Sequence, residues 1–178
     1  MDGIDSSYIR RCHKRLKEWD APLTNWLCVE IRDVADEEDE VVEYFTCELC
    51  GCEKVRYVHL MSNADYYKDV SVGCICAGVM EGDILAAKDR ERIARNRSKR
   101  KSNYLKKTWL EYTDTLWKLK YKKEHLIIEK CEFMSRPYFI VTISGDGYHW
   151  KDNRRMTSFL EAQHYTFEIL EDLCEKNI

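Results

Sequence analysis

CELCGCEKVRYVHLM, residues 47–61, and VSVGCICAGVMEGD, residues 70–83, together decide the fold of this chain. Cys47 and Cys50 form a C-x2-C pair, the spacing at which a tight turn directs two thiolates at one metal ion. Gly51 follows the pair and tolerates the positive φ that such a turn needs. The first stretch therefore predicts one half of a zinc site.

A second pair, Cys74 and Cys76, lies at the end of VSVGCIC, which we predict to be a short strand, and the predicted hairpin brings the two pairs together. Four thiolates complete a tetrahedral shell without room for water or substrate, so we expect a structural zinc ion whose binding is coupled to folding. The alternatives are four buried free thiols, or a shell in which Cys52 or His59 replaces one ligand. The remaining cysteines are scattered on apolar faces and are expected in the core: Cys12, Cys28, Cys131 and Cys174.

The residues before the zinc motif predict one helix and one hairpin. Apolar residues recur at helical spacing over 5–19, and Pro22 follows the end of that helix. Residues 25–34 and 41–46 read as strands that flank the acidic stretch ADEEDE, which predicts an antiparallel hairpin with an acidic tip. We expect this tip to be a solvated loop or a mimic of phosphate that contacts a basic partner.

The residues after the zinc motif predict a long helix and a second unit. Asp83 is the expected N-cap of a helix that runs to residue 109. Ser158 and Glu161 form a capping box for a last helix, which follows three predicted strands over residues 115–121, 124–132 and 137–144. We therefore predict an α+β chain with three parts: an N-terminal helix with a treble-clef-like zinc domain over 1–81, a basic helix over 82–109 and a βββα unit over 110–178.

Charge is unevenly distributed, although the net charge is only −3. Residues 92–107 contain eight cations and no acid, whereas residues 36–43 contain six acids and no base. A basic run of this kind can neutralise phosphates without reading sequence. We expect it to bind a nucleic acid or a nucleoprotein, and the alternative is pairing with the acidic hairpin of the same or another copy. The candidate contact residues are Arg92, Arg95, Arg97, Lys99, Arg100, Lys101, Lys106 and Lys107. The segment RNRSKRKSN is expected not to pack on a core.

A predicted turn near the C-terminus mixes aromatic and cationic residues, which suits stacking on bases or contact with a phosphate backbone. The βββα order weakly resembles the DNA-reading units of some phage integrases. A packing or dimerisation unit is the alternative, because aromatic residues and arginine are also common in protein interfaces. The contact residues expected here are Tyr148, Trp150, Lys151, Arg154 and Arg155.

Residues 45–110 resemble a group of small bacterial and phage-associated zinc proteins. The resemblance rests on the pattern C-E-L-C-G … R-Y-V-H … V-G-C-x-C-A … M-x-G-D and on the basic segment RERIARNR. It implies a treble-clef-like zinc fold, and the occurrence of such proteins near mobile-element or defence genes suggests work on nucleic acid or on a nuclease. Cys52 and the acidic hairpin depart from the pattern.

The sequence favours a binding protein over an enzyme. It has no H-x-E with P-C-x2-C, no G-x-S-x-G, no P-loop and no H-E-x-x-H motif, and its carboxylates lack the spacing of a nuclease site. Without an export signal or an apolar run of membrane length, we expect a cytoplasmic location and metal-binding cysteines rather than disulfides. The resulting hypothesis is a non-catalytic zinc accessory protein that modulates a DNA-acting nuclease such as a CRISPR effector. The alternatives are a stand-alone DNA- or RNA-binding protein and a self-assembling, dimeric adaptor.

Overall fold

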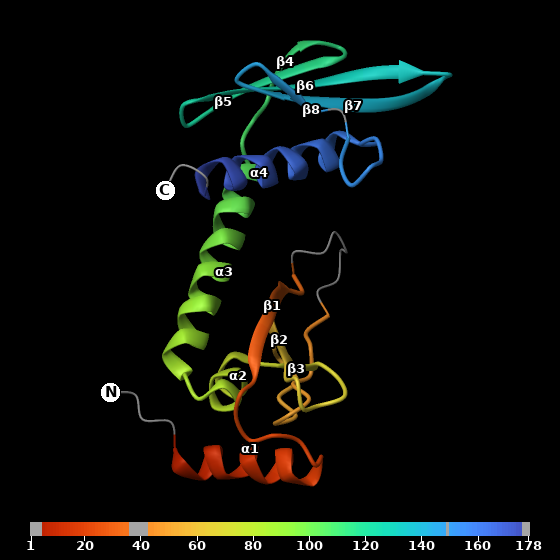
Figure 1. Ribbon diagram of the computed structural model, residues 1–178. Helices are drawn as coiled ribbons and strands as arrows, with labels where there is room; N and C mark the ends of the chain where they lie inside the picture. The colour runs from red at the N-terminus through yellow and green to blue at the C-terminus, as the bar shows by residue number, and fades with distance from the viewer. Residues whose placement is uncertain (1–4, 36–42, 149, 176–178) are drawn as a thin grey trace. The chain divides into compact units, whose positions relative to one another are not determined.

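The computed structural model describes residues 5–35, 43–148 and 150–175, and it has an α+β fold with four helices and two antiparallel sheets (Figure 1). The chain forms two compact units, the first ending at Lys99 and the second beginning at Arg100. Each unit has its own buried apolar cluster. The boundary falls inside the long helix α3 (Ile84–Leu105).

A three-stranded sheet organises the first unit, with β2 (Tyr57–Ser62) between β1 (Leu27–Asp33) and β3 (Val70–Val72). The predicted hairpin between residues 25–34 and 41–46 is wrong, because β1 pairs with β2 instead. Most side chains of β2 are buried on both faces of the sheet, and β2 is the central strand, paired with β1 and β3. The acidic tip lies mostly outside the described residues.

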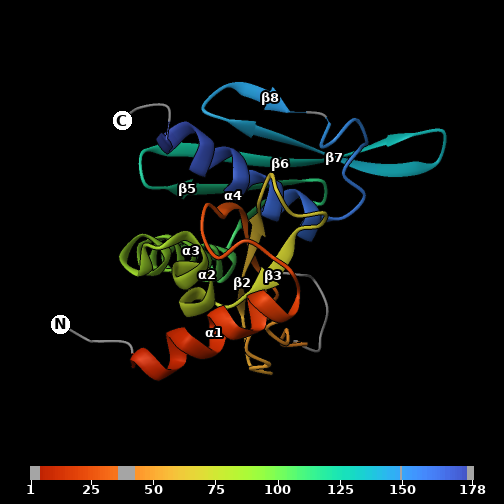
Figure 2. The same ribbon diagram turned by 60° about the horizontal axis from the view of Figure 1, so that its bottom comes forward.

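Helix α1 (Ser6–Glu18) confirms the predicted N-terminal helix and is capped by Asp5, whose side chain accepts a hydrogen bond from Ser7 N. Helix α2 (Cys74–Glu81) corrects the second zinc stretch, which was predicted to remain extended through Cys76. The strand ends at Val72, and the helix starts two residues later. Figure 2 shows α1 and α2 beside the three-stranded sheet, and α2 contacts β1, β2 and α1.

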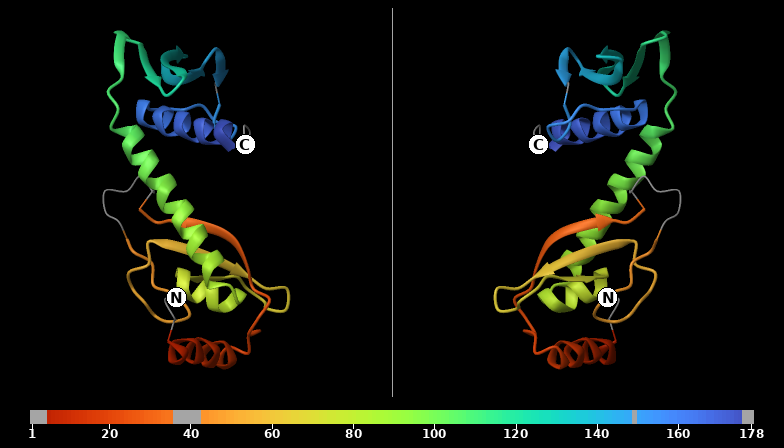
Figure 3. Two further views of the ribbon diagram at one scale, coloured as in Figure 1. Left: turned by 90° about the vertical axis from the view of Figure 1, so that its left-hand side faces the viewer. Right: turned by 90° about the vertical axis from the view of Figure 1, so that its right-hand side faces the viewer.

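The second unit contains a sheet of five strands rather than the predicted three. The two additional strands are short edge strands, which lack a long alternating pattern. The last helix, α4 (Phe159–Glu175), covers one face of this sheet through contacts with the two longest strands (Figure 3). The strands, in sequence and spatial order, are β4 (Leu110–Thr113), β5 (Leu116–Tyr121), β6 (Glu124–Phe133), β7 (Arg136–Ile143) and β8 (Asp146–Tyr148).

The predicted helix caps are present at α3 and α4. Asp83 Oδ1 accepts a hydrogen bond from Ala86 N at 2.9 Å, and Ser158 Oγ accepts one from Glu161 N at 3.0 Å. The Glu161 carboxylate accepts a hydrogen bond from Thr157 N at 2.7 Å. A standard capping box uses the backbone N–H of the N-cap residue, which is one residue later. Both helix starts were therefore identified correctly from the sequence.

The basic part of α3 is more closely packed than we expected. Ser98 is half-buried and donates a hydrogen bond to Asp33, while the side chain of Lys101 is buried although it has no apolar neighbour in sequence. Tyr104, one turn of helix later, is fully buried in the core of the second unit. The expectation that the basic segment cannot pack is therefore wrong, because long cationic side chains bury their methylene stems.

A glycine fixes the approach of α2 to the start of α3. A Cβ atom added to Gly78 would lie 2.6 Å from the Cα atom of Ile84, which is a backbone atom. We predict that Gly78→Ala lowers the free energy of unfolding by about 1–3 kcal/mol through overpacking. The control is Gly82→Asn, where an added Cβ atom has no neighbour within 4 Å and the φ of +79° is one that asparagine tolerates better than most residues. Chemical denaturation of both variants tests this, and equal losses would contradict the packing argument.

Candidate metal centre

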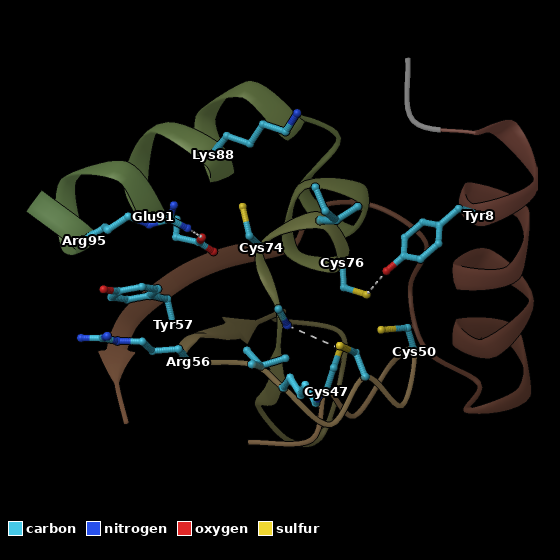
Figure 4. A pocket seen from close by; sticks show the side chains of 15 residues that line it. Tyr8, Cys47, Cys50, Arg56, Tyr57, Cys74, Cys76, Lys88, Glu91 and Arg95 are labelled. Atoms are coloured by element: carbon cyan, nitrogen blue, oxygen red, sulfur yellow. Dashed lines mark hydrogen bonds and ion pairs between the residues drawn. The ribbon is translucent and has the colours of Figure 1, made fainter. Parts of the chain in front are cut away.

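The predicted zinc turn forms at Cys47–Cys50. Gly51 N donates a hydrogen bond to Cys47 O at 2.8 Å, and the φ of Gly51 is +73°. The sequence-based requirement for glycine here is confirmed, because this conformation is strained for other residues. The turn directs both cysteines towards the N-terminal end of α2 (Figure 4).

Three of the four predicted zinc ligands come together. The sulfur atoms of Cys47, Cys50 and Cys76 lie within 4.8 Å of one another, a grouping that can hold a metal ion. Cys47 and Cys76 are buried, whereas Cys50 is exposed. Gly73 N lies 3.4 Å from Cys47 Sγ and Tyr8 Oη lies 3.0 Å from Cys76 Sγ (Figure 4), so both groups can support the sulfur atoms. We call these three cysteines the sulfur cluster.

Crowding of the sulfur atoms perturbs their protonation. A hydrogen bond with Cys76, aided by the backbone of Cys50 and Gly73, lowers the pKa of Cys47 to about 5 against the effect of burial. Hydrogen bonds with Cys12 and Cys47, together with burial, raise the pKa of Cys76. Cys76 thus keeps its proton and shares it in hydrogen bonds with the neighbouring sulfur atoms. A metal ion can take the place of that proton, because thiolates are the form that binds metal.

Cys12 is a further sulfur atom at this cluster. It is buried on α1, and the hydrogen bond with Cys76 is the main cause of the lowered pKa of its thiol. The sequence placed Cys12 in the core, and burial is confirmed. It interacts with Cys76 but lies outside the group of three sulfur atoms that are all within 4.8 Å of one another, so it would have to move closer to act as the fourth ligand. No spacing rule indicated this candidate, because α1 is distant in sequence.

Cys74 does not join the sulfur cluster. Residues two apart on an α-helix are separated by about 200° around its axis, so Cys74 and Cys76 point in nearly opposite directions. Figure 4 shows the Cys74 sulfur directed towards α3 and the Cys76 sulfur directed towards Tyr8. The C-x-C pair would share one ion from a strand, where alternate side chains lie on one face, but it starts a helix here.

Cys74 instead belongs to a second group, with His59 of β2 and Glu91 of α3. One candidate ligand atom from each of these residues lies within 4.8 Å of the other two, so this group can also hold a metal ion. Burial lowers the pKa of His59, but Cys28, Cys74 and Glu91 outweigh it and raise that pKa to about 10. A metal ion bound at His59 therefore has to displace a proton near neutral pH.

Both groups border one cavity of about 650 Å³. The sulfur cluster lines it together with Cys74 and Glu91 (Figure 4). Four cationic side chains also line it: Lys54, Arg56, Lys88 and Arg95. The cavity therefore combines metal-binding donors with positive charge.

The predicted basic contacts of α3 are divided among different environments. Arg92, Arg95 and Lys99 are exposed, whereas Arg97 is half-buried. Arg92 and Arg95 form ion pairs within the helix, to Asp89 at 3.1 Å and to Glu91 at 2.6 Å.

The remaining candidates on the basic run lie in the second unit. Arg100 pairs with Glu171 of α4, and Lys101 is buried. Lys106 and Lys107 follow the end of α3 and are exposed. Within the described parts of the chain, no ion pair to an acid is seen for Lys99, Lys106 or Lys107.

The cations of the C-terminal turn are engaged within the second unit. Lys151 pairs with Glu168 at 3.2 Å, and Arg154 pairs with Glu161 at 2.7 Å. Arg155 lies over three aromatic rings, with its Cζ 4.2 Å, 4.9 Å and 5.2 Å from the ring centroids of Tyr138, Phe133 and Trp150. Tyr148 packs edge-on against Tyr165. The cations of the turn are therefore engaged within the unit, and among its described residues only Trp150 offers a large exposed ring.

Comparisons of the chain with protein-family models, with curated proteins and with solved structures find no match. The resemblance to a zinc-protein family thus stays a prediction. Among the described helices, none has the length and apolar character required to cross a membrane.

Sequence reasoning missed Tyr8 and Glu91, and it treated Cys12 only as a core residue. Glu91 has no distinguishing mark inside a highly charged helix. One signal was present: Gly73 followed by CICAGVME permits a helix that starts at Cys74. A helical register at these residues separates Cys74 from Cys76 on the basis of spacing alone.

We predict that Cys12→Ser weakens zinc binding at the sulfur cluster by more than the roughly 10- to 100-fold cost of losing an outer hydrogen-bond partner. Cys74→Ser leaves the affinity of that cluster within a few-fold, because its sulfur points elsewhere. Competition with a chromophoric chelator measures both affinities, with Cys131→Ser as the control. Loss of the tightest zinc in Cys74→Ser but not in Cys12→Ser would restore the original four-cysteine assignment.

Proposed function

We propose that this chain is a zinc-stabilised binding protein that presents a cationic face of α3 to a nucleic acid or nucleoprotein. The observation that carries the proposal is the exposed set Arg92, Arg95, Asn96 and Lys99. These residues occupy positions i, i+3, i+4 and i+7 of one helix and therefore share one face. Three of the four residues are cations and none is an acid, although Asp89 lies one turn before Arg92 and pairs with it.

Zinc is the metal that best suits the sulfur cluster. Three converging thiols with a fourth beside them match the sulfur-rich tetrahedral shells of structural zinc sites. The cluster links the turn at Cys47–Cys50 to the start of α2, so an ion bound there would hold these two segments of the first unit together, and Cys12 as the fourth ligand would add α1.

The cationic face suits phosphate contacts better than the C-terminal turn does. Its ion pair at Arg92 is exposed on both sides and is worth little in water. The cations of the turn are already satisfied by carboxylates or aromatic rings. Modulation of a nuclease such as a CRISPR effector is a narrower version of this proposal, and a stand-alone DNA- or RNA-binding role is the runner-up.

Charge reversal tests the cationic face. We predict that Arg92→Glu/Lys99→Glu lowers affinity for a short duplex by at least roughly 60-fold at 0.1 M salt, because two lost phosphate contacts remove about 2 from the slope of log K against log salt. Fluorescence anisotropy with DNA and RNA duplexes over a salt series measures both quantities.

The matched control is Lys14→Glu/Lys17→Glu on α1. It changes the net charge equally and also includes one exposed ion pair within a helix, Lys14 to Glu18 at 3.9 Å. We expect only a small loss from long-range charge. Equal losses in the two variants would show that binding depends on total charge rather than on α3.

Metal removal tests the zinc part of the proposal. We predict that the purified chain contains zinc and that a strong chelator lowers the melting temperature of the first unit, because the apo cluster leaves several sulfur atoms crowded in an apolar core. Calorimetry with and without zinc measures this shift. Cys47→Ser should reproduce the chelator effect, whereas Cys174→Ser should not. An unchanged melting profile would contradict a structural role.

A further inference from the structure

We propose that His59, Cys74 and Glu91 form a second metal site, separate from the sulfur cluster, that takes a zinc-like divalent cation through one nitrogen, one sulfur and one oxygen. The three side chains come from β2, α2 and α3, so the site depends on the tertiary fold. It does not depend on the proposed contact with nucleic acid.

An unsatisfied buried nitrogen points to this site. His59 is fully buried, and its Nε2 atom has no hydrogen-bond partner within the described residues. A buried polar atom of this kind costs about 1–3 kcal/mol if it stays unpaired. Glu91 Oε2 is 3.9 Å from Nε2, too far for a hydrogen bond but within ion-pair distance when His59 is protonated.

The separations are close to those of a filled site. Two ligands bonded to zinc at about 2.0–2.3 Å in a tetrahedral shell lie roughly 3.3–3.8 Å apart. A nitrogen–oxygen pair lies at the short end of that range, about 3.3–3.5 Å. The separation of His59 Nε2 and Glu91 Oε2 is 3.9 Å, longer than this by roughly 0.5 Å, and the Cys74 sulfur completes a group within 4.8 Å. Small side-chain movements would therefore bring all three donors to one ion.

Neighbouring groups orient two of the three ligands. Cys28 Sγ donates to Glu30 O at 3.3 Å, so the sulfur is left to accept from His59 Nδ1 at 3.8 Å. In the neutral ring that a metal requires, the proton is thus placed on Nδ1, and loss of the Nε2 proton leaves a lone pair there for the metal. Arg95 holds Glu91 Oε1 at 2.6 Å and leaves Oε2 directed at His59. Outer hydrogen bonds of this kind are typical of metal sites.

A cysteine–histidine–glutamate catalytic triad fits the same residues less well. In a triad the two ring nitrogens separate the nucleophile from the orienting carboxylate. Here a single His59 nitrogen lies within 4.8 Å of both the sulfur and the carboxylate oxygen, and the other nitrogen faces Cys28. Donors that converge on one point are the arrangement for a shared cation.

The charges also balance. A thiolate at Cys74 and a carboxylate at Glu91 supply two negative charges, which a divalent cation neutralises in a partly buried position. Both residues line the cavity described above, so an ion held by them is reachable from it. Three protein ligands leave one tetrahedral position for water or an anion, unlike the closed shell expected at the sulfur cluster.

Metal counting on the full chain tests the proposal. We expect about two zinc ions per wild-type chain by elemental analysis after removal of loosely bound metal. Glu91→Gln and Cys74→Ser should each weaken one zinc by at least about 10- to 100-fold and leave the other unchanged. Asp89→Asn, on the same helix, and Cys131→Ser are controls that should keep both. Circular dichroism shows whether each variant is folded.

Cobalt separates the two sites by their spectra. Addition of cobalt to the metal-free chain should proceed in two steps, and the step with weaker thiolate charge-transfer absorption should vanish in Glu91→Gln. A single step in the wild type, or two steps that persist in Cys74→Ser/Glu91→Gln, would overturn the second site. If the wild type holds one zinc and only Cys50→Ser loses it, the second site is overturned, whereas the proposal of a structural zinc at the sulfur cluster still holds.

Discussion

The direction in which α2 leaves β3 controls the whole metal-binding region. Because the helix begins at Cys74, the two cysteines of the C-x-C pair are turned about 200° apart. One of them faces α1 and the turn at Cys47–Cys50, and the other faces β2 and α3. Gly78 allows α2 to pack closely against the first residue of α3, which fixes that orientation. The start of α2 at Cys74 therefore places the Cys76 sulfur beside Cys47 and Cys50 and the Cys74 sulfur beside His59 and Glu91.

This constraint links the metal sites to the cationic face of α3. Glu91 lies on the helix between Lys88 and Arg95, so the residue that faces His59 belongs to the same segment that carries the exposed cations. Arg95 contacts both Glu91 and the ring of Tyr57, which places its guanidinium at the edge of the cavity. The proposed metal sites and the proposed anion-binding face therefore share structural supports in the first unit.

The sequence predicts the local features well and the long-range ones poorly. The turn at Cys47–Cys50 with Gly51, the cap at Asp83 and the start of α4 at Ser158 depend on a few consecutive residues, and all were identified. The pairing of β1 with β2 and the approach of His59 to Glu91 depend on contacts between distant segments. A short apolar run such as VSVGCIC also fits a strand or a helix start equally well. The proposed ligands of the second site were therefore beyond reach of spacing alone.

Cadmium NMR tests most directly whether Cys74 and Cys76 serve different metal ions, since scalar coupling through a bound cadmium ion identifies the cysteines that share it. We predict two cadmium resonances, one coupled to the β-protons of Cys47, Cys50 and Cys76 and the other coupled to those of Cys74. One resonance coupled to both Cys74 and Cys76 would contradict this arrangement, because α2 could not then begin at Cys74.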